Sequence, residues 1–350
     1  MATVAEVTAM RRAIAHARRG SLTTPPNPDV GCIVLDSDGQ IAGEGYHERA
    51  GQPHAEVHAL SAAGDRARGG TAVVSLEPCN HTGRTEPCVQ ALVGAGVARV
   101  VYAVADPDPV AAGGGAALRS HGVDVEGSVL EAEASQANAR WLLPLRQHRP
   151  FVVWKVATTL DGRTAAVDGT SRWITGPQAR AEVHQLRRAV DTVVVGVGTV
   201  VADDPQLTAR DEDGNPRPRE HQPLRVVVDT QGRTPRGSRV LDETAPTWVA
   251  TSAEVGGGVD GVDLSALLAR LYEQRRSYVL LEGGASLAAA FWRSGLVDRT
   301  VAYLAPALLG AGAPALADIG ITTIDDIVRL EHSEFTTAGA DICLTATRRI

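Results

Sequence analysis

The sequence has 350 residues, of which 44% are hydrophobic and 21% are charged, and its formal net charge at pH 7 is −7. This length exceeds what a single hydrophobic core usually supports, so we expect two globular domains. The acidic balance argues against a dedicated nucleic-acid surface, and no apolar run reaches the ~18 residues of a membrane span. The segment 1–20 lacks the continuous apolar core of a signal peptide, so we expect a cytoplasmic protein. Its pattern predicts an amphipathic helix whose inward residues are Val4, Val7, Ala13 and Ile14.

Apolar runs of strand length alternate with helical patterns in the first part of the chain. The expected strands are 30–35, 71–76, 99–104 and 123–126, and the expected helices are 54–63, 88–95 and 112–121. This alternation predicts a largely parallel sheet with helices on both faces. The block ends in a connector that contains prolines and arginines, at residues 141–150.

A second series of the same kind follows. Its expected strands are 151–157, 192–198, 224–229, 247–251, 277–284, 299–306 and 342–348, and its expected helices are 177–189, 263–276 and 285–294. Two segments rich in glycine, proline or charge are expected to be surface loops, 211–222 and 253–261. We therefore predict two α/β domains, at residues 1–147 and 148–350.

A pattern of histidine, glutamate and cysteine stands out in the first domain. In GQPHAEVHAL, His54 and Glu56 lie at the start of an expected helix. In LEPCNHTGRTEPC, Cys79 follows a strand and Cys88 opens the next helix. The positive ends of helix dipoles favour anions such as thiolates at these places. Thiolates together with imidazole favour zinc, and three protein ligands leave the fourth position that a catalytic zinc requires.

Glu56 offers a carboxylate that could transfer protons, which a purely structural zinc site does not need. A carboxylate beside an activated water can accept its proton and return it to a leaving group. His-x-Glu followed by Pro-Cys and a further Cys is typical of zinc-dependent base deaminases, although eight residues separate Cys79 from Cys88 here. We predict that His54, Cys79 and Cys88 hold zinc and that Glu56 is catalytic. We expect Cys32 and Cys343 to be core residues, and His58 either to be structural or to support the metal ligands.

Longer segments resemble one known family. TPPNPDVGCIV, GEGYHERAGQPHAEVHAL, LEPCNHTGRTEPC and VADPDPVAAGGG are similar to the deaminase half of the bifunctional riboflavin-biosynthesis deaminase–reductases, which share the wide spacing of the two cysteines. KVATTLDGRTA, SRWITGPQAR, VGVGTVVADDPQLTAR and LLEGGASLAAAF are similar to the reductase half. The resemblance covers almost the whole chain, in order.

The resemblance implies a fold and two activities. The fold would be an N-terminal cytidine-deaminase-like α/β/α sandwich followed by a C-terminal dihydrofolate-reductase-like α/β domain. A zinc hydrolase would deaminate 2,5-diamino-6-ribosylamino-4(3H)-pyrimidinone 5′-phosphate, and an NADPH oxidoreductase would then reduce the ribosyl side chain to ribityl. The implied partners are these small molecules, without nucleic acid or membrane, and the implied assembly is a homo-oligomer.

The resemblance also assigns substrate contacts in the deaminase half, at Asn27, His47, His81 and Arg84. An amide can read a pyrimidine edge, and histidine and arginine suit a phosphate. In DPDP, Asp108 places a carboxylate where the family commonly has the amide of asparagine.

In the reductase half, EGG and VGVGT are glycine-bearing turns after strands, and free amides at a helix start can bind phosphate. Neither is the G-x-G-x-x-G of a standard Rossmann fold. By resemblance, the NADPH contacts are Ala157, Trp173 at a strand edge, Thr199, Asp203, Thr230, Gly284, Ala285, Ser286, Leu287, Ala288, Ala289 and Ala290. The sugar-phosphate contacts are Ser171, Arg187, Leu207, Arg210 and Glu282, and Lys155 and Asp161 match positions near the nicotinamide. Hydride transfer mostly requires positioning, so we expect no large acid–base cluster in this half.

Three alternatives stay open at this point. The chain could be another zinc deaminase, of nucleosides or tRNA bases, fused to a nucleotide-binding domain. It could be a non-catalytic zinc module joined to a nucleotide-sensing domain, although such a module has no use for Glu56. Finally, only one of the two halves could be active.

Overall fold

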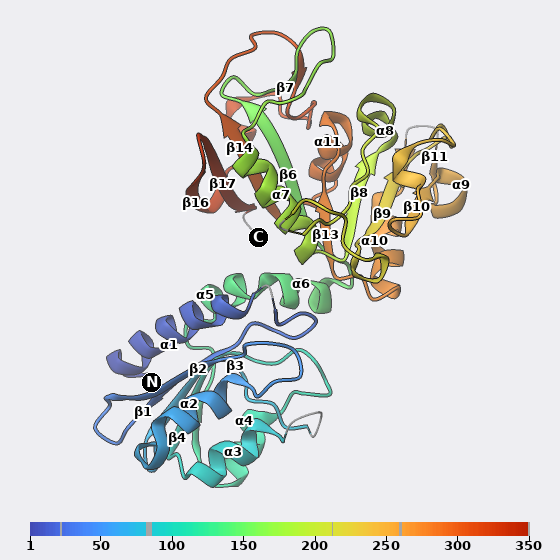
Figure 1. Ribbon diagram of the computed structural model, residues 1–350. Helices are drawn as coiled ribbons and strands as arrows, with labels where there is room; N and C mark the ends of the chain where they lie inside the picture. Colours follow the sequence, from blue (N-terminus) through green and yellow to red (C-terminus); the bar gives the residue numbers. More distant parts are fainter. Residues whose placement is uncertain (22, 82–85, 212, 259–260, 349–350) are drawn as a thin grey trace. The chain divides into compact units, whose positions relative to one another are not determined.

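The computed structural model describes residues 1–21, 23–81, 86–211, 213–258 and 261–348 (Figure 1). The chain divides into two compact units, Met1–Gln147 and His148–Ile350. Among the described residues, none of the helices combines the length and the apolar character of a membrane span.

The first unit is built on a five-stranded sheet with the order β2-β1-β3-β4-β5. Its strands are β1 (Gly31–Leu35), β2 (Ile41–Tyr46), β3 (Thr71–Leu76), β4 (Arg99–Val104) and β5 (Asp124–Glu126). Its helices are α1 (Val4–Ala17), α2 (Ala55–Ala63), α3 (Cys88–Ala95), α4 (Gly114–Ser120), α5 (Glu131–Ala137) and α6 (Ala139–Gln147). Figure 1 shows α1 and α5 on one face of the sheet and α2, α3 and α4 on the other, which makes an α/β/α sandwich.

The sheet of the first unit is mixed rather than largely parallel, so that expectation was wrong. Strand β1 runs antiparallel to both β2 and β3, and only the β3–β4 and β4–β5 pairs are parallel. Strand β2 escaped prediction because its sequence, IAGEGY, has two glycines and few strand-forming residues. The N-terminal helix also differs: Val4 is 85% exposed, whereas Ala13 and Ile14 are buried. Val4 lies on the opposite side of the helix from the buried Ala13, nine residues later, because each residue advances the helix by about 100°.

The second unit contains an eight-stranded sheet with the order β10-β9-β8-β13-β6-β14-β17-β16. Its strands are β6 (Phe151–Thr159), β8 (Thr192–Gly196), β9 (Leu224–Val228), β10 (Thr247–Ala250), β13 (Tyr278–Leu281), β14 (Arg299–Ala305), β16 (Leu330–Ala338) and β17 (Asp341–Arg348). Two small pairs stand apart, β7 (Arg163–Ala165) with β15 (Ala313–Pro314) and β11 (Gly257–Gly258) with β12 (Gly261–Val262). The helices are α7 (Pro177–Ala189), α8 (Val197–Asp203), α9 (Ser252–Val255), α10 (Leu264–Glu273) and α11 (Ala285–Arg293).

Strand direction in this sheet decides where a ligand can enter. The six neighbouring strands from β10 to β14 are all parallel to one another. Strand β17 pairs antiparallel with β14, and β16 pairs antiparallel with β17. The carboxyl ends of β9, β8, β13 and β6 therefore meet at one edge, where parallel α/β sheets usually bind their ligands. Strand β16 was not predicted because its sequence, LEHSEFTTA, is largely polar. Part of 253–261, expected as a loop, forms α9 and short β-strands.

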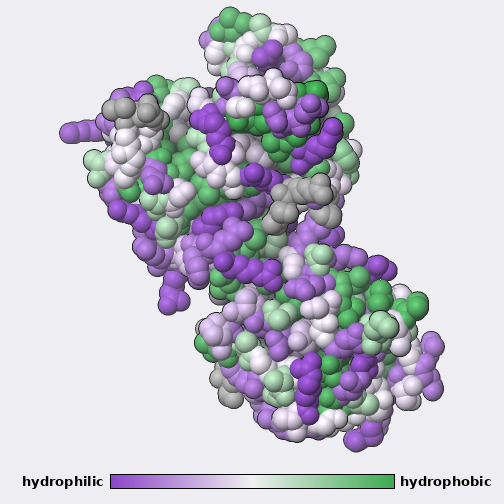
Figure 2. Space-filling view, turned by 180° about the vertical axis from the view of Figure 1, so that it is seen from behind, coloured by the Kyte–Doolittle hydropathy of each residue, from purple (hydrophilic) through white to green (hydrophobic). Residues whose placement is uncertain are grey.

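Each unit has a core of its own. In the first, the side chains of β1 are all buried between helices, and Cys32 is fully buried there, as expected. In the second, β6, β9 and β13 pack against the leucines of α10 and against α11, and Cys343 is buried in β17. On the face drawn in Figure 2, hydrophilic residues are spread over the surface with hydrophobic ones among them, which is ordinary for a folded chain.

Candidate active sites of the two units

His54, Cys79 and Cys88 come together in the first unit. Nδ1 of His54 and the two Sγ atoms all lie within 4.8 Å of one another. His54 Nδ1 is 3.1 Å from Cys88 Sγ and 3.6 Å from Cys79 Sγ. A tetrahedral zinc ion, with Zn–N and Zn–S bonds of about 2.1 and 2.3 Å, requires separations of this size. The donor set and its spacing therefore fit zinc.

Local sequence places these three side chains. His54 is the N-cap of α2, and α3 begins at Cys88, directly after Pro87. The free amide of Cys88 donates a hydrogen bond to Cys79 Sγ at 3.4 Å. Hydrogen bonds with Cys88 and then with His54 lower the pKa of Cys79 to about 4, whereas the pKa of Cys88 is raised. Cys79 is thus held as a thiolate, which is the form that binds metal.

The close approach of α2 to β2 depends on Gly45. A Cβ at this position would lie 2.4 Å from the carbonyl oxygen of Ala55 and 2.7 Å from Cβ of His58. Because glycine has no side chain, α2 can pack directly on the strand, and this packing positions the start of the helix. His58 does not line the cavity described next, which agrees with a structural role.

The carboxylate of Glu56 is buried, and one of its oxygen atoms lacks a hydrogen bond from the described residues. The residue is 3% exposed, and within the described part of the chain its Oε2 atom accepts no hydrogen bond. Burial raises the pKa of its carboxyl group. Glu56, His54 and Cys79 line a cavity of about 490 Å³. Because an unpartnered buried polar atom is costly, Oε2 is arranged for a ligand rather than for stability.

Three of the predicted substrate residues line the same cavity, Asn27, His47 and His81. His47 Nδ1 is 3.2 Å from the carbonyl oxygen of Pro53, which can only accept, so Nδ1 carries the proton. His47 Nε2 is then free to accept from Asn27 Nδ2 at 3.2 Å. The fourth predicted residue, Arg84, lies outside the described residues.

Sequence reasoning did not identify Asp106 and Trp141 as cavity residues. Asp106 follows β4, and burial raises its pKa to about 6. Its Oδ1 accepts from the backbone of Asp108, whose own Oδ1 accepts from the backbone of Val110. Asp106 could have been predicted from its position just after a parallel strand, where ligands usually bind. Nothing in the sequence connects Trp141 of α6 with this cavity.

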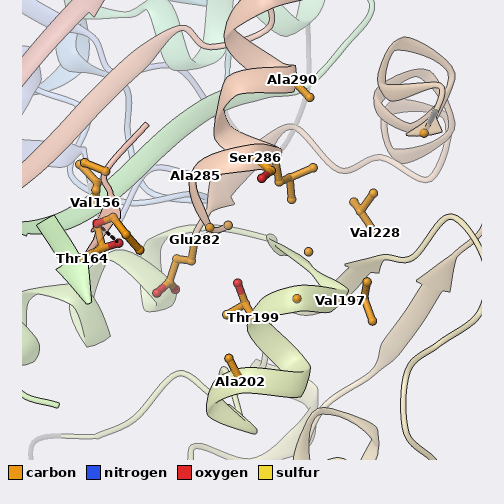
Figure 3. Close-up of a pocket in the computed structure, with 18 of the residues that line it drawn as sticks. Val156, Thr164, Val197, Thr199, Ala202, Val228, Glu282, Ala285, Ser286 and Ala290 are labelled. Atoms are coloured by element: carbon orange, nitrogen blue, oxygen red, sulfur yellow. Dashed lines mark hydrogen bonds between the residues drawn. The ribbon is translucent and has the colours of Figure 1, made fainter. Parts of the chain in front are cut away.

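The second unit has a larger cavity, of about 1000 Å³, at the carboxyl ends of β6, β13, β8 and β9 (Figure 3). Glu282, Thr199 and Ser286 converge on it from separate elements. Eleven of the predicted cofactor and substrate residues line it: Ala157, Ser171, Thr199, Asp203, Thr230, Glu282, Gly284, Ala285, Ser286, Leu287 and Ala290.

Six other predicted residues do not line this cavity. Ala288 and Ala289 are fully buried on the inner side of α11, and Leu207 is 4% exposed. Trp173 is not at a strand edge; it lies in a turn, 70% exposed, with the guanidinium of Arg180 4.6 Å from its ring. The remaining two, Arg187 and Arg210, are bound to other protein groups.

A buried charged cluster lies beside the cavity, contrary to the expectation of none. Arg187 donates two hydrogen bonds to Glu282, and Lys155 and His184 complete the group. Burial lowers the pKa of Lys155. Burial alone would raise the pKa of Glu282, but the positive charge of Arg187 outweighs it and the pKa is lowered. The members come from β6, α7 and the end of β13, so no sequence spacing connects them.

Two further predicted residues are held by the protein itself. Ser171 Oγ donates to Asp203 Oδ1 at 3.3 Å. Asp161 accepts from the backbone of Gly310 at 2.6 Å and does not line the cavity. Asp161 therefore holds the loop after β14 against the turn after β6.

Comparisons with known proteins agree with both halves. The model of the cytidine and deoxycytidylate deaminase zinc-binding region matches residues 4–104, and that of the RibD C-terminal domain matches residues 150–344. The riboflavin biosynthesis protein RibD of Escherichia coli is 42% identical over 357 residues, covering 96% of this chain and 97% of that protein. RibD of Mycobacterium tuberculosis is 43% identical over 342 residues, covering 97% of both.

Solved structures show the same relationship over the whole chain. Form 1 of Acinetobacter baumannii RibD has a TM-score of 0.79 at 39% identity, covering 99% of both chains. The Thermotoga maritima diaminohydroxyphosphoribosylaminopyrimidine deaminase/5-amino-6-(5-phosphoribosylamino)uracil reductase has a TM-score of 0.77 at 33% identity and the same coverage. The predicted fold of both halves is thus confirmed. The chain belongs to the RibD family of bifunctional riboflavin-biosynthesis enzymes, which join a zinc-binding deaminase domain to a reductase domain.

Proposed function

We propose that the chain performs two successive reactions, with deamination in residues 1–147 and reduction in residues 148–350. The first would hydrolyse the 2-amino group of 2,5-diamino-6-ribosylamino-4(3H)-pyrimidinone 5′-phosphate. The second would use NADPH to reduce the ribosyl side chain of the product to ribityl. The observation that carries the proposal is the unpartnered, buried Oε2 of Glu56 beside three side chains that fit zinc.

In the deaminase, His54, Cys79 and Cys88 would hold zinc, which when bound supplies a Lewis acid that lowers the pKa of a water molecule. Glu56 would accept a proton from this water at Oε2 as its oxygen adds to C2 of the pyrimidine. Glu56 would then pass the proton to the amino nitrogen, which leaves as ammonia. Water is consumed and a carbonyl replaces the amine, so the reaction balances.

The other residues of this cavity would orient the base. His47 holds Asn27 through its Nε2, and both lie at the cavity wall. An amide beside a neutral imidazole offers one donor and one acceptor direction, which suits the edge of a pyrimidine. His81 lines the same cavity, and we propose His81 and Arg84 as the contacts for the phosphate.

In the reductase, NADPH supplies a hydride when bound, and the protein has to position it and manage a proton. The start of α11, at residues 284–286, presents free amides to the middle of the cavity, where they would bind the pyrophosphate. Lys155 and Glu282 lie at the β6 side. The ribose ring oxygen needs a proton as the ring opens, and Lys155, beside the ionised Glu282, is placed to provide it.

Arg187 is better explained as a positioning residue than as a phosphate ligand. Its Nε and Nη2 atoms are both occupied by Glu282, which lines the cavity while Arg187 does not. We propose Ser171, which lines the cavity, as a contact for the sugar phosphate, and we carry Arg210 over from the family resemblance, since its own donors are bound to Gly214 and Gln206. By family resemblance we further propose that the chain acts in the cytoplasm, as a homo-oligomer.

Metal analysis combined with a coupled assay tests the proposal. The purified chain is offered the pyrimidinone phosphate, cytidine and tRNA in parallel, and ammonia release and NADPH oxidation are followed. We expect zinc in the protein and ammonia from the pyrimidinone phosphate alone, followed by NADPH oxidation. Turnover of only cytidine or tRNA would favour the alternative of another base deaminase.

A further inference from the structure

The cavity of the second unit has two chemically different ends. Its wall crosses four neighbouring strands, from β6 to β9, over roughly 14 Å at about 4.8 Å per strand. Lys155 and Glu282 lie at the β6 end. Thr230, Arg233 and residues 261–265 lie at the β9 end. Because hydride transfer belongs beside the titratable groups, the nicotinamide would occupy the β6 end and the adenosine would reach the β9 end.

The β9 end contains an unpaired cation. Within the described residues, the guanidinium of Arg233 has no ion pair and no hydrogen bond, and the side chain is exposed. The other arginine of the cavity wall, Arg293, donates to the carbonyl oxygen of Asp318 at 2.6 Å. Arg233 therefore has its full hydrogen-bonding capacity available for a ligand.

Among the described residues of the β9 end, Asp229 and Asp263 both accept hydrogen bonds from backbone amides. Asp229, directly after β9, is fully buried and accepts from the amide and the hydroxyl of Thr234, both at 2.7 Å. Asp263 caps α10 by accepting from the amides of Ser265 and Ala266. In Rossmann dinucleotide sites an acid binds the ribose 2′-hydroxyl of NAD, whereas an arginine accommodates the 2′-phosphate of NADP, and the same pairing of charges applies to any site for these cofactors. Asp229 does not line the cavity, whereas Arg233 does.

We infer, on the basis of the proposed NADPH use, that Arg233 binds the 2′-phosphate and sets the preference for NADPH over NADH. The guanidinium fork can donate two parallel hydrogen bonds to a phosphate, which gives both affinity and geometric selectivity. Asp229 acts as a positioning residue, because its hydrogen bonds to Thr234 hold the loop that carries Arg233.

Isothermal titration calorimetry with NADP⁺ and with NAD⁺ tests this inference without any turnover. We expect the wild-type chain to bind NADP⁺ at least about tenfold more tightly than NAD⁺. Arg233→Ala should raise the Kd for NADP⁺ about tenfold and change that for NAD⁺ less than about twofold. Arg233→Lys, which keeps the charge but not the fork, should fall between them.

Arg236→Ala is the matched control, since Arg236 is an exposed arginine of the same loop that does not line the cavity. It should leave both Kd values within about twofold. An Arg233→Ala variant that keeps the wild-type preference, or that weakens NADP⁺ and NAD⁺ equally, would overturn the role of Arg233 and leave the proposed reductase intact. A wild-type chain that binds neither dinucleotide would overturn both.

Discussion

Arg187 of α7 donates two hydrogen bonds to Glu282, from Nε to Oε1 at 2.6 Å and from Nη2 to Oε2 at 2.9 Å. The side chains are only 14% and 8% exposed. A buried pair of this kind is weak evidence of net stabilisation, but removing one partner leaves the other charge uncompensated. The pair also joins α7 to the end of β13, at the edge of the reductase cavity.

Arg187→Ala should therefore lower the free energy of unfolding of the second unit by about 3–5 kcal/mol. Arg188→Ala, at the neighbouring exposed position, should change it by less than about 0.5 kcal/mol. Urea unfolding of the full chain, followed by tryptophan fluorescence, measures both variants. Equally small losses of unfolding free energy in the two variants would show that the Arg187–Glu282 pair does not stabilise the second unit.

The same pair predicts a loss of stability in acid. The folded-state pKa of Glu282 lies below the ordinary value of 4.5. Its contribution is therefore complete above that value and is lost as the pH falls through the folded-state pKa. The unfolding free energy of Glu282→Gln should fall less than that of the wild type between about pH 5 and pH 3. If the unfolding free energies of the wild type and Glu282→Gln fell equally with pH, the lowered pKa of Glu282 would be contradicted.

Glu56→Gln should retain zinc and lose deamination by about 10²–10⁴-fold, because the amide keeps the shape of the carboxylate but cannot carry the proton. Metal analysis and ammonia release are measured on the same preparation. Glu48→Gln, at an exposed position upstream of α2, should leave both unchanged. Deamination at the wild-type rate by Glu56→Gln would refute the proton-transfer role of Glu56.

Cys79→Ser should remove zinc binding and deamination while NADPH oxidation with the deaminated intermediate persists. The reason is that the cluster lies in residues 1–147 and the larger cavity lies in residues 148–350. A chelator should have the same effect on the wild type. Cys32→Ala, in the core of the same unit, is the control and should keep its zinc. Loss of both activities in Cys79→Ser would show that the halves depend on each other.

Gly45→Ala should push α2 away from β2, since the added Cβ would lie 2.4 Å from the carbonyl oxygen of Ala55. We expect a loss of stability of about 1–3 kcal/mol together with weaker zinc binding, because His54 caps this helix. Gly94→Ala places a Cβ in open space on α3 and should be neutral or slightly stabilising. Unchanged zinc affinity in Gly45→Ala would contradict the role of this contact.

The deaminase site was the easier of the two sites to predict, because its chemistry lies at element ends. His54 and Glu56 are two residues apart at one helix start, and Cys88 opens another helix. Helix starts can be read from local sequence, so the donor types and their approximate placement were accessible. Asp106 and Trp141 were not, because a cavity wall is assembled from segments without a common pattern.

Less of the reductase site could be predicted from the sequence. Glycine-containing turns indicated where β8 and β13 end. The sequence of α11 could not show which of its alanines face the cavity, as Ala285 does, and which face the core, as Ala288 does. Asp161 and Trp173 have local partners instead of cavity positions.

The sequence by itself determined the α/β alternation, the zinc-binding residue types and, through long matching segments, the family. Those features depend on periodicity and on residues that are close together in the chain. Only the tertiary structure decided the antiparallel placement of β1, the charged cluster around Glu282 and the position of Arg233 opposite Lys155. The physical reason is that strand order and burial bring distant residues together, and side-chain pairing then depends on desolvation that no local pattern encodes.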